Sequence, residues 1–429
     1  MDIQCLKEKV GGTVFSIPSK SEIHRLLIAS AFSDRETVIE TGSLPEPSED
    51  MKATALCLKE AGADVDFTEG SFSVKPFNKD GNGNFLLKDN PVLDCGESGS
   101  TLRFILPVIS AVSEDFYITG SGRLPDRPIK DLLRTLEKNG KTFSEDKIPF
   151  RVKGRLNNGS FHIPGNISSQ YITGLLLALP LLKGDSEIVL DTVLESSPYI
   201  DITLSVLESF GIKPERRETG WFIKGGQKFI SPGRIKAGGD WSNSAFFLTL
   251  GALSENPVTV KGLDRNSCQG DREIIDILKK AGADVSFSGD SVTVKKGTLK
   301  GQVISLKEIP DLLPVLSVLA AFSSGDTIFT DCERLRLKES DRVKAVSEMI
   351  ESLGGKTETE GNTLRIKGTG KLRGGTVDSF NDHRLVMAAA VAGAFTETPV
   401  TIEKAEAVNK SYPGFFKDFE ELGGSFYGF

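Results

Sequence analysis

The chain has 429 residues, 38% of them hydrophobic and 26% charged, and its formal net charge is −7. A chain of this length exceeds what one ordinary hydrophobic core organises, so two domains are expected. The acidic balance argues against a dedicated nucleic-acid-binding protein, although it is compatible with a local basic cleft.

Other bulk features favour a cytoplasmic protein that works without a membrane or a metal. No apolar run reaches the length of a membrane span, and Met1–Cys5 is not a basic segment leading into an apolar core. The cysteines stand singly at positions 5, 57, 95, 268 and 332. Their number and spacing suggest neither a disulfide framework nor a zinc site.

Taken in chain order, the sequence repeats one pattern six times: an amphipathic helix that ends at a glycine and leads into a strand. The six glycines are Gly62, Gly140, Gly211, Gly282, Gly354 and Gly423, roughly 70 residues apart. Each is placed to adopt the left-handed conformation that follows a helix C-terminus. We therefore expect an α/β fold of six units, three per domain.

Most units also hold a more apolar helix, expected at 101–112, 169–182, 242–252, 311–322 and 382–394. Because these helices are apolar nearly all round, they should lie buried at the centre of each domain, with sheets outside. Alternating stretches such as 71–75, 221–224 and 291–295 predict half-exposed strands. A first strand at 4–10 precedes the first unit, and we expect it to pair with the second half of the chain.

Polar residues at the starts of helices supply the first candidates for chemistry. Pro18 and Ser19 precede Lys20, and Glu22 completes a capping-box pattern. This places Lys20 and Arg25 near a helix N-terminus, where the dipole favours an anion. The alternative interpretation is a capped surface helix with solvated charges.

Three further segments carry similar alternatives. Two glycines beside hydroxyls, in Gly96-Glu97-Ser98-Gly99-Ser100, could admit an anion to backbone N–H groups or simply form a tight turn. Residues 334–338 alternate like a strand before a helix at 343–353, and their charges could form a solvated salt-bridge face. The cations Arg123, Arg127 and Lys410 lie in proline-bounded loops that hold side chains firmly.

Together these motifs resemble the 3-phosphoshikimate 1-carboxyvinyltransferases, also called 5-enolpyruvylshikimate-3-phosphate synthases. The segments that carry the resemblance are Pro18-Ser19-Lys20-Ser21 with Arg25, Gly96 to Gly99 with Arg103, Arg127-Pro128-Ile129, Ser168-Ser169-Gln170, Lys338-Glu339-Ser340-Asp341-Arg342, Asn381-Asp382-His383-Arg384 and Asn409-Lys410. The resemblance implies a two-domain inside-out α/β barrel of six units, with helices inside and sheets outside. The implied domains are 1–18 plus 238–429, and 19–237, with the active site in the cleft between them.

By the same resemblance, the reaction joins phosphoenolpyruvate to the 5-hydroxyl of shikimate 3-phosphate and releases phosphate. Shikimate 3-phosphate would contact Lys20, Ser21, Arg25, Ser168, Ser169, Gln170, Ser196, Tyr199, Asp311 and Lys338. Phosphoenolpyruvate would contact Lys20, Gly99, Arg123, Gln170, Arg342, Arg384 and Lys410. The resemblance implies a cytoplasmic monomer that uses no cofactor, and it implies neither a nucleic-acid nor a membrane partner.

The resemblance also assigns catalytic roles to Asp311 as the base, Glu339 as the acid, and Lys20. A carboxylate pair whose environments separate the two pKa values suits such proton transfers. The alternative role for Asp311, which follows Pro310, is to cap the buried helix. Glu97 and Arg334 depart from residues common in the family and put local substrate contacts in question.

Two alternative functions stay open from the sequence. A UDP-N-acetylglucosamine enolpyruvyl transferase would share the fold and the chemistry. That family has an Asn after the first Lys and a Cys in the loop before Arg-Pro, whereas this chain has Ser21 and a loop without cysteine. A ring-shaped clamp around DNA would need cations along strand or helix faces, whereas here they gather at helix starts and in loops.

Overall fold

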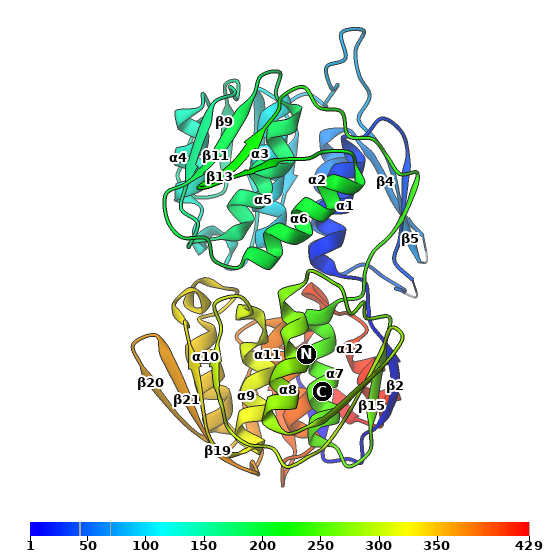
Figure 1. Ribbon diagram of the computed structural model, residues 1–429, viewed down its shortest axis with the longest axis vertical. Coiled ribbons are helices and arrows are strands. Elements are labelled where there is room, and N and C mark those ends of the chain that lie inside the picture. Colours follow the sequence, from blue (N-terminus) through cyan, green and yellow to red (C-terminus); the bar gives the residue numbers. More distant parts are fainter. Residues whose placement is uncertain (43, 69, 429) are drawn as a thin grey trace. The chain divides into compact units, whose positions relative to one another are not determined.

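The computed structural model describes residues 1–42, 44–68 and 70–428 (Figure 1). The chain forms two compact units. Unit 1 consists of Met1–Ile17 and Gly238–Phe429, and unit 2 consists of Pro18–Ala237. Among the described residues, no helix combines the length and the apolar character that crossing a membrane would need.

The helices of unit 2 are α1 (Lys20–Ala31), α2 (Glu49–Ala61), α3 (Gly99–Val112), α4 (Lys130–Lys138), α5 (Ser169–Ala178) and α6 (Ser197–Ser209), with the 3-10 helices η1 (Leu124–Asp126) and η2 (Leu179–Leu181). Its strands are β3 (Thr37–Glu40), β4 (Asp64–Thr68), β5 (Ser71–Lys75), β6 (Val92–Asp94), β7 (Asp115–Thr119), β8 (Thr142–Phe143), β9 (Phe150–Lys153), β10 (Ser160–Ile163), β11 (Ser186–Leu190), β12 (Glu215–Arg217), β13 (Gly220–Ile223) and β14 (Arg234–Lys236).

The helices of unit 1 are α7 (Trp241–Leu253), α8 (Ile274–Ala281), α9 (Leu313–Phe322), α10 (Arg342–Ser352), α11 (His383–Gly393) and α12 (Phe415–Glu421), with the 3-10 helices η3 (Gly270–Glu273), η4 (Pro310–Leu312), η5 (Glu333–Leu337) and η6 (Ala405–Lys410). Its strands are β1 (Ile3–Leu6), β2 (Gly12–Phe15), β15 (Val258–Lys261), β16 (Asp284–Ser288), β17 (Ser291–Lys295), β18 (Val303–Ser305), β19 (Ser324–Thr330), β20 (Lys356–Glu360), β21 (Thr363–Thr369), β22 (Gly375–Asp378), β23 (Val400–Glu403) and β24 (Ser425–Gly428).

The described strands form six four-stranded sheets that share one topology. In unit 2 the strand orders are β14-β3-β5-β4, β6-β7-β9-β8 and β10-β11-β13-β12, and in unit 1 they are β16-β17-β15-β2, β18-β19-β21-β20 and β22-β23-β1-β24. Each sheet has one parallel pair at an edge and two antiparallel pairs beyond it. This common pattern is consistent with repeated units.

The repeat glycines behave as the sequence predicts. Gly62 and Gly282 are the C-caps of α2 and α8 and have φ angles of 119° and 106°. The other four glycines of the repeat also have positive φ. A Cβ at Gly282 would lie 2.4 Å from the carbonyl oxygen of Thr298, so the turn needs both the conformation and the missing side chain.

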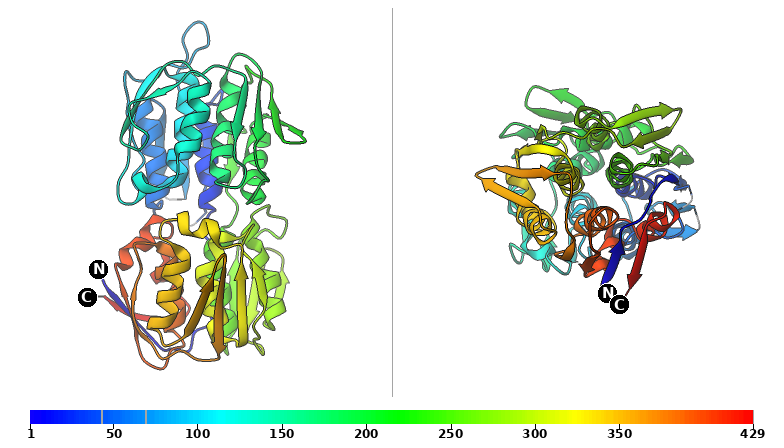
Figure 2. Two further views of the ribbon diagram at one scale, coloured as in Figure 1. Left: turned by 90° about the vertical axis from the view of Figure 1, so that its left-hand side faces the viewer. Right: turned by 90° about the horizontal axis from the view of Figure 1, so that it is seen from below.

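The five apolar helices expected from the sequence correspond to α3, α5, α7, α9 and α11, and each is buried along nearly its whole length. In unit 1, the buried helix α9 packs against β21, and the neighbouring helix α10 packs against β20 (Figure 2). Because the sides of these helices are buried, polar groups can gather only at their ends, and the first turn of each helix is one such place.

The first strand does pair with the second half of the chain. β1 lies between β23 and β24, with Ile3 opposite both Ile402 and Gly428, so the two ends of the chain share one sheet (Figure 2). The predicted strand at 4–10 is shorter than expected, since β1 ends at Leu6. A second strand, β2, pairs in parallel with β15.

The strand expected at 334–338 is wrong. The segment forms the 3-10 helix η5, in which the N–H of Leu335 donates to the carbonyl of Cys332 at 3.1 Å. Leu335 is buried, whereas Leu337 is 44% exposed, so the alternation does not mark two faces of a strand. The neighbouring sheet is already complete, because β19 is paired on both sides by β18 and β21.

Candidate functional site

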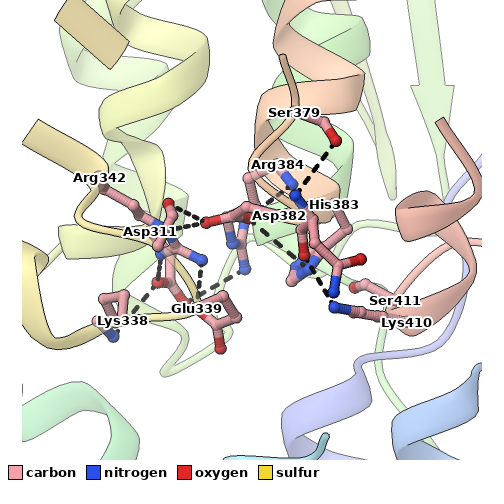
Figure 3. A network of polar contacts seen from close by, with 12 residues as sticks. Asp311, Lys338, Glu339, Arg342, Ser379, Asp382, His383, Arg384, Lys410 and Ser411 are labelled. Atoms are coloured by element: carbon pink, nitrogen blue, oxygen red, sulfur yellow. Dashed lines mark hydrogen bonds and ion pairs between the residues drawn. The ribbon is translucent and has the colours of Figure 1, made fainter. Parts of the chain in front are cut away.

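The polar site of unit 1 is built around the side chain of Arg342, the first residue of α10. Asp341 caps this helix by accepting from the N–H of Lys344 at 3.1 Å. The Arg342 side chain is 1% exposed, and its three nitrogens each donate to a different carboxylate (Figure 3). Nε reaches Asp382 Oδ2 at 2.9 Å, Nη1 reaches Asp311 Oδ1 at 2.5 Å, and Nη2 reaches Glu339 Oε2 at 2.7 Å.

These carboxylates keep the guanidinium charged. Burial by itself lowers the pKa of Arg342, but the negative charges of Asp382, Glu339 and Asp311 outweigh burial and raise that pKa well above its ordinary value. A charge taken out of water is tolerated only when it is paired and hydrogen-bonded. The three carboxylates are therefore held in place by one cation.

Asp311 lies among cations and does not act as a helix cap. It is the middle residue of η4, and the N-cap residues of η4 and α9 are Ile309 and Leu312. Besides Arg342, its carboxylate meets Arg384 Nη2 at 3.2 Å and Lys338 Nζ at 3.4 Å. The capping role considered for Asp311 is therefore wrong.

Asp382 positions the start of α11. It is fully buried, accepts from the N–H of Arg384 at 3.0 Å, and also accepts from the hydroxyl of Ser340 at 3.0 Å. His383 Nδ1 lies 3.9 Å from Asp382 Oδ1, and both side chains are buried. The cap thus orients Arg384 toward Asp311.

Two lysines complete this group of charges, which we call the unit 1 cluster: Asp311, Lys338, Glu339, Arg342, Asp382, Arg384 and Lys410 (Figure 3). Lys410, at the end of η6, donates to the carbonyl of Asn381 at 2.8 Å and is 7% exposed. Burial lowers the pKa of Lys338, whose side chain is still 26% exposed. The cluster can bind an anion and also offers carboxylates for proton transfer.

In unit 2, α1 directs its two cations toward different neighbours. Ser19 caps the helix by accepting from the N–H of Glu22, as the sequence predicts. Lys20 Nζ pairs with Asp50 Oδ2 of α2 at 2.6 Å, and both side chains are 15% exposed. The surface-helix alternative is wrong, because α1 is buried from Ile23 to Ala31.

Arg25 ties three helices of unit 2 together. It is 2% exposed, and its Nε donates to Thr203 Oγ1 at 2.8 Å. Its Nη2 donates to Thr173 Oγ1 at 3.2 Å and to the carbonyl of Tyr199 at 2.9 Å, and its Nη1 donates to the carbonyl of Ser21. Arg25 thereby joins the start of α1 to α5 and α6.

A second arginine cluster surrounds Gly99, the first residue of α3. A Cβ at Gly99 would lie 2.5 Å from Arg103 Nη1 and 2.6 Å from Arg127 Nη1, so both guanidinium groups pack against the glycine. Arg103 Nη1 donates to Gln170 Oε1 at 2.9 Å, and Gln170 Nε2 donates to Ser100 Oγ at 2.9 Å. The structure therefore brings Gly99 and Gln170 together.

The other predicted residues of unit 2 lie at helix starts or in loops. Ser168 caps α5 by accepting from the N–H of Gln170 at 3.3 Å, and Ser169 is buried. Ser196 precedes α6 with a φ of 55°. Arg123 precedes η1 and is exposed.

The two residues that depart from the family pattern have neighbours of their own. A Cβ at Gly122 would meet the Glu97 carboxylate, so Glu97 lies over the loop that contains Arg123. Arg334 Nη2 donates to the carbonyl of Lys307 at 2.7 Å.

Sequence reasoning missed the partners that hold the predicted cations. Asp50, Thr173 and Thr203 were not predicted, because they come from helices far along the chain from α1. Asp382 is the exception, because an acidic residue directly before a buried helix is a recognisable cap signal in the sequence. No group of three or more His, Cys, Asp or Glu within the described ranges is arranged to hold a metal ion.

Comparison with known proteins gives a consistent result over the whole chain. A family profile described as EPSP synthase (3-phosphoshikimate 1-carboxyvinyltransferase) matches residues 6–419. The 3-phosphoshikimate 1-carboxyvinyltransferase of Clostridium novyi (strain NT) is 40% identical over 433 residues, covering 99% of this chain and 98% of that protein. The protein of the same description from Methanocorpusculum labreanum is 35% identical over 420 residues, covering 97% of each.

Solved structures agree with this similarity. An EPSP synthase from Acinetobacter baumannii superimposes with a TM-score of 0.82 at 25% identity, covering 100% of both chains. The enolpyruvyl transferase NikO from Streptomyces tendae superimposes with a TM-score of 0.78 at 17% identity, covering 99% of this chain and 98% of its own. The second likeness concerns the fold alone.

The buried cap Asp382 offers a test of how the unit 1 cluster is stabilised. Asp382→Asn keeps an oxygen that can cap α11 but removes the charge that faces Arg342. We expect the free energy of unfolding to fall by about 3 kcal/mol, the lower end for breaking a buried pair, since Arg342 keeps two other carboxylates. Equilibrium urea denaturation measures this loss.

The matched control is Asp326→Asn, which removes a carboxylate paired with Arg365 at 3.6 Å on the exposed face of β19. Its cost should stay below about 1 kcal/mol. Equal losses in the two variants would contradict the special role of the buried charge.

Proposed function

The chain belongs to the EPSP synthase (3-phosphoshikimate 1-carboxyvinyltransferase) family, and we propose that it transfers the enolpyruvyl group of phosphoenolpyruvate to the 5-hydroxyl of shikimate 3-phosphate. Inorganic phosphate is released. The family match over residues 6–419 supports this acceptor over UDP-N-acetylglucosamine. The structural observation that carries the proposal is the unit 1 cluster, where Lys338, Arg342 and Arg384 pair with the carboxylates of Asp311 and Glu339.

Phosphoenolpyruvate is assigned to cations and small groups from both units: Lys20, Gly99, Arg123, Gln170, Arg342, Arg384 and Lys410. Arg342 and Arg384 support this assignment because both pair with the carboxylate of Asp311. Their guanidinium groups can pair with an anionic group of the substrate in the same way. Gly99 supports it because two guanidinium groups lie against its Cα.

Shikimate 3-phosphate is assigned to a more hydroxyl-rich set: Lys20, Ser21, Arg25, Ser168, Ser169, Gln170, Ser196, Tyr199, Asp311 and Lys338. Arg25 supports this assignment because its hydrogen bonds to the carbonyls of Ser21 and Tyr199 fix the chain at both residues. Ser168 and Ser169 stand at the N-terminus of α5, where a phosphate is favoured.

In the proposed mechanism, the oxygen of the 5-hydroxyl bonds to the central carbon of phosphoenolpyruvate while Asp311 accepts the proton of that hydroxyl. Glu339, in its protonated form, donates its proton to the methylene carbon, which becomes a methyl group. The carbon–oxygen bond to phosphate then breaks, and the methyl group returns a proton to the Glu339 carboxylate, which restores the double bond. Lys20, Arg342, Arg384 and Lys410 stabilise the negative charge of the leaving phosphate.

The finer architecture and the setting are part of the proposal. We propose an inside-out α/β barrel of three units in each domain, with domains 1–18 plus 238–429 and 19–237 that both supply substrate groups. The buried helices α3, α5, α7, α9 and α11 support the central position of helices. A cytoplasmic monomer is proposed, and the cysteines, all of which are free, fit a reducing compartment.

The choice of acceptor is tested by phosphate release from phosphoenolpyruvate. Release should require shikimate 3-phosphate and should be absent with UDP-N-acetylglucosamine or with no acceptor. Mass spectrometry of the product should show the acceptor enlarged by the enolpyruvyl group. Release with UDP-N-acetylglucosamine alone would overturn the proposal.

The role of Asp311 is tested by Asp311→Asn, which keeps the shape of the side chain but cannot take the proton. Turnover should fall by about 10²–10⁴-fold, the usual contribution of general base catalysis. The affinity for phosphoenolpyruvate should stay the same or rise, because a negative charge beside an anion is removed.

Asp341→Asn is the control, since Asn caps α10 about as well as Asp and the residue lies outside the assigned contacts. Its turnover should remain within about threefold of the wild type. Turnover of Asp311→Asn in that same range would remove Asp311 from the mechanism.

A further inference from the structure

A buried carboxyl group lies beside the unit 1 cluster without belonging to it. Asp271, in η3, is 4% exposed, and its Oδ1 has no hydrogen-bond partner among the described residues. The 3-10 helix η3 packs against α7 and α8. A buried polar atom without a partner is costly, so its presence beside a reactive site calls for an explanation.

The groups that act on Asp271 come from several elements of unit 1. Asp311 of η4 and Arg384 of α11 interact with it electrostatically, as does Asp240, the cap of α7. The hydroxyl of Ser242 lies near Asp271 and lowers its pKa, although neither Ser242 Oγ nor Asp271 Oδ1 has a partner that meets hydrogen-bond geometry. On its own element, Arg272 and Glu273 are exposed, and Arg272 donates to the carbonyl of Arg265.

Asp271 and Asp311 therefore share the neighbourhood of one guanidinium. Arg384 is paired with Asp311 at 3.2 Å, and Asp311 has further ion pairs with Arg342 and Lys338. Asp271 makes no ion pair in the described part of unit 1. Burial, followed by the charge of Asp311, raises the pKa of Asp271 to about 7, against the opposing charge of Arg384.

Asp271 and Asp311 lie in such different surroundings that the tendency of each carboxyl group to ionise should differ. Asp311 has ion pairs with three cations, which favour its negatively charged form. Asp271 is buried without a pairing cation, and burial favours its protonated form. Ionisation of Asp271 would place a second negative charge beside Arg384 and draw the guanidinium toward itself.

We propose that Asp271 is a positioning residue whose proton keeps Arg384 paired with Asp311 and available to the carboxylate or phosphate of phosphoenolpyruvate. This inference rests on the proposed function, because it assigns Arg384 to that substrate. Loss of the proton weakens binding of phosphoenolpyruvate more than it slows turnover, since Arg384 is moved while Asp311 and Glu339 stay bonded to Arg342.

The first test is the pH dependence of KM for phosphoenolpyruvate in the wild type and in Asp271→Asn, which mimics the protonated form. In the wild type, KM should rise above pH 7, by up to about tenfold per pH unit. In Asp271→Asn this rise should be absent, and turnover at pH 6 should stay within about threefold of the wild type. An unchanged KM profile in the variant would overturn the proposal.

The matched control is Asp418→Asn. Asp418 is another carboxyl group of unit 1 whose pKa burial raises, but its partner is the hydroxyl of Tyr412, outside the unit 1 cluster. Its replacement should leave the KM profile as in the wild type. The same change in both variants would show a general effect of buried carboxyl groups and would overturn the specific role of Asp271.

A second test needs no activity. Because folding raises the pKa of Asp271, the folded state holds a proton that the unfolded state has lost. The contribution of Asp271 to stability should therefore fall as pH rises from about 4 to about 7. Carbon-13 NMR of aspartate-labelled, substrate-free protein should show one carboxyl signal that titrates near pH 7 and is missing in Asp271→Asn, or in Asp271→Ser if the Asn variant does not fold.

These readouts separate the two proposals. A signal near pH 7 in a protein that lacks transfer activity would overturn the proposed function and the role of Asp271 in it, while leaving the buried proton established. An active enzyme whose Asp271 signal titrates near pH 4 would overturn this inference alone.

Discussion

One buried guanidinium organises the chemistry of unit 1. Arg342 is 1% exposed, and the cost of removing its charge from water is several kcal/mol unless partners offset it. The three carboxylates that do so come from separate places in the fold: Asp311 from η4, Glu339 from the turn before α10, and Asp382 from the cap of α11. Because a planar guanidinium fixes its donors in one plane, it also fixes where these carboxylates can lie.

The fold places such groups at helix starts for a reason that follows from the repeat. A helix that is buried on all sides can expose polar groups only at its ends, and its first turn has unpaired N–H groups. Asp240, Asp382 and Ser98 satisfy those groups as caps. The same turns then carry Arg384 in unit 1 and Gly99 in unit 2. The residues that build the fold and those assigned to substrates are therefore neighbours in sequence.

Local features could be predicted from the sequence, whereas long-range partners could not. The positive φ of Gly282 and the cap at Ser19 depend on a few adjacent residues, and both predictions are confirmed. The strand expected at 334–338 was wrong. The alternation of apolar and charged residues indicates only that Leu335 is buried, and it does not show whether a neighbouring strand is free to pair. Asp50 lies 30 residues from Lys20, and Thr203 lies 178 residues from Arg25, so no local pattern links these pairs.

The central claim is that catalysis depends on the planar fork of Arg342 and not merely on its charge. Turnover of Arg342→Lys with phosphoenolpyruvate and shikimate 3-phosphate tests this claim most directly, because an ammonium keeps the charge but cannot hold three carboxylates in one plane. We expect a variant that still folds, by circular dichroism, with turnover reduced by at least about a hundredfold. Turnover within a few-fold of the wild type would contradict it.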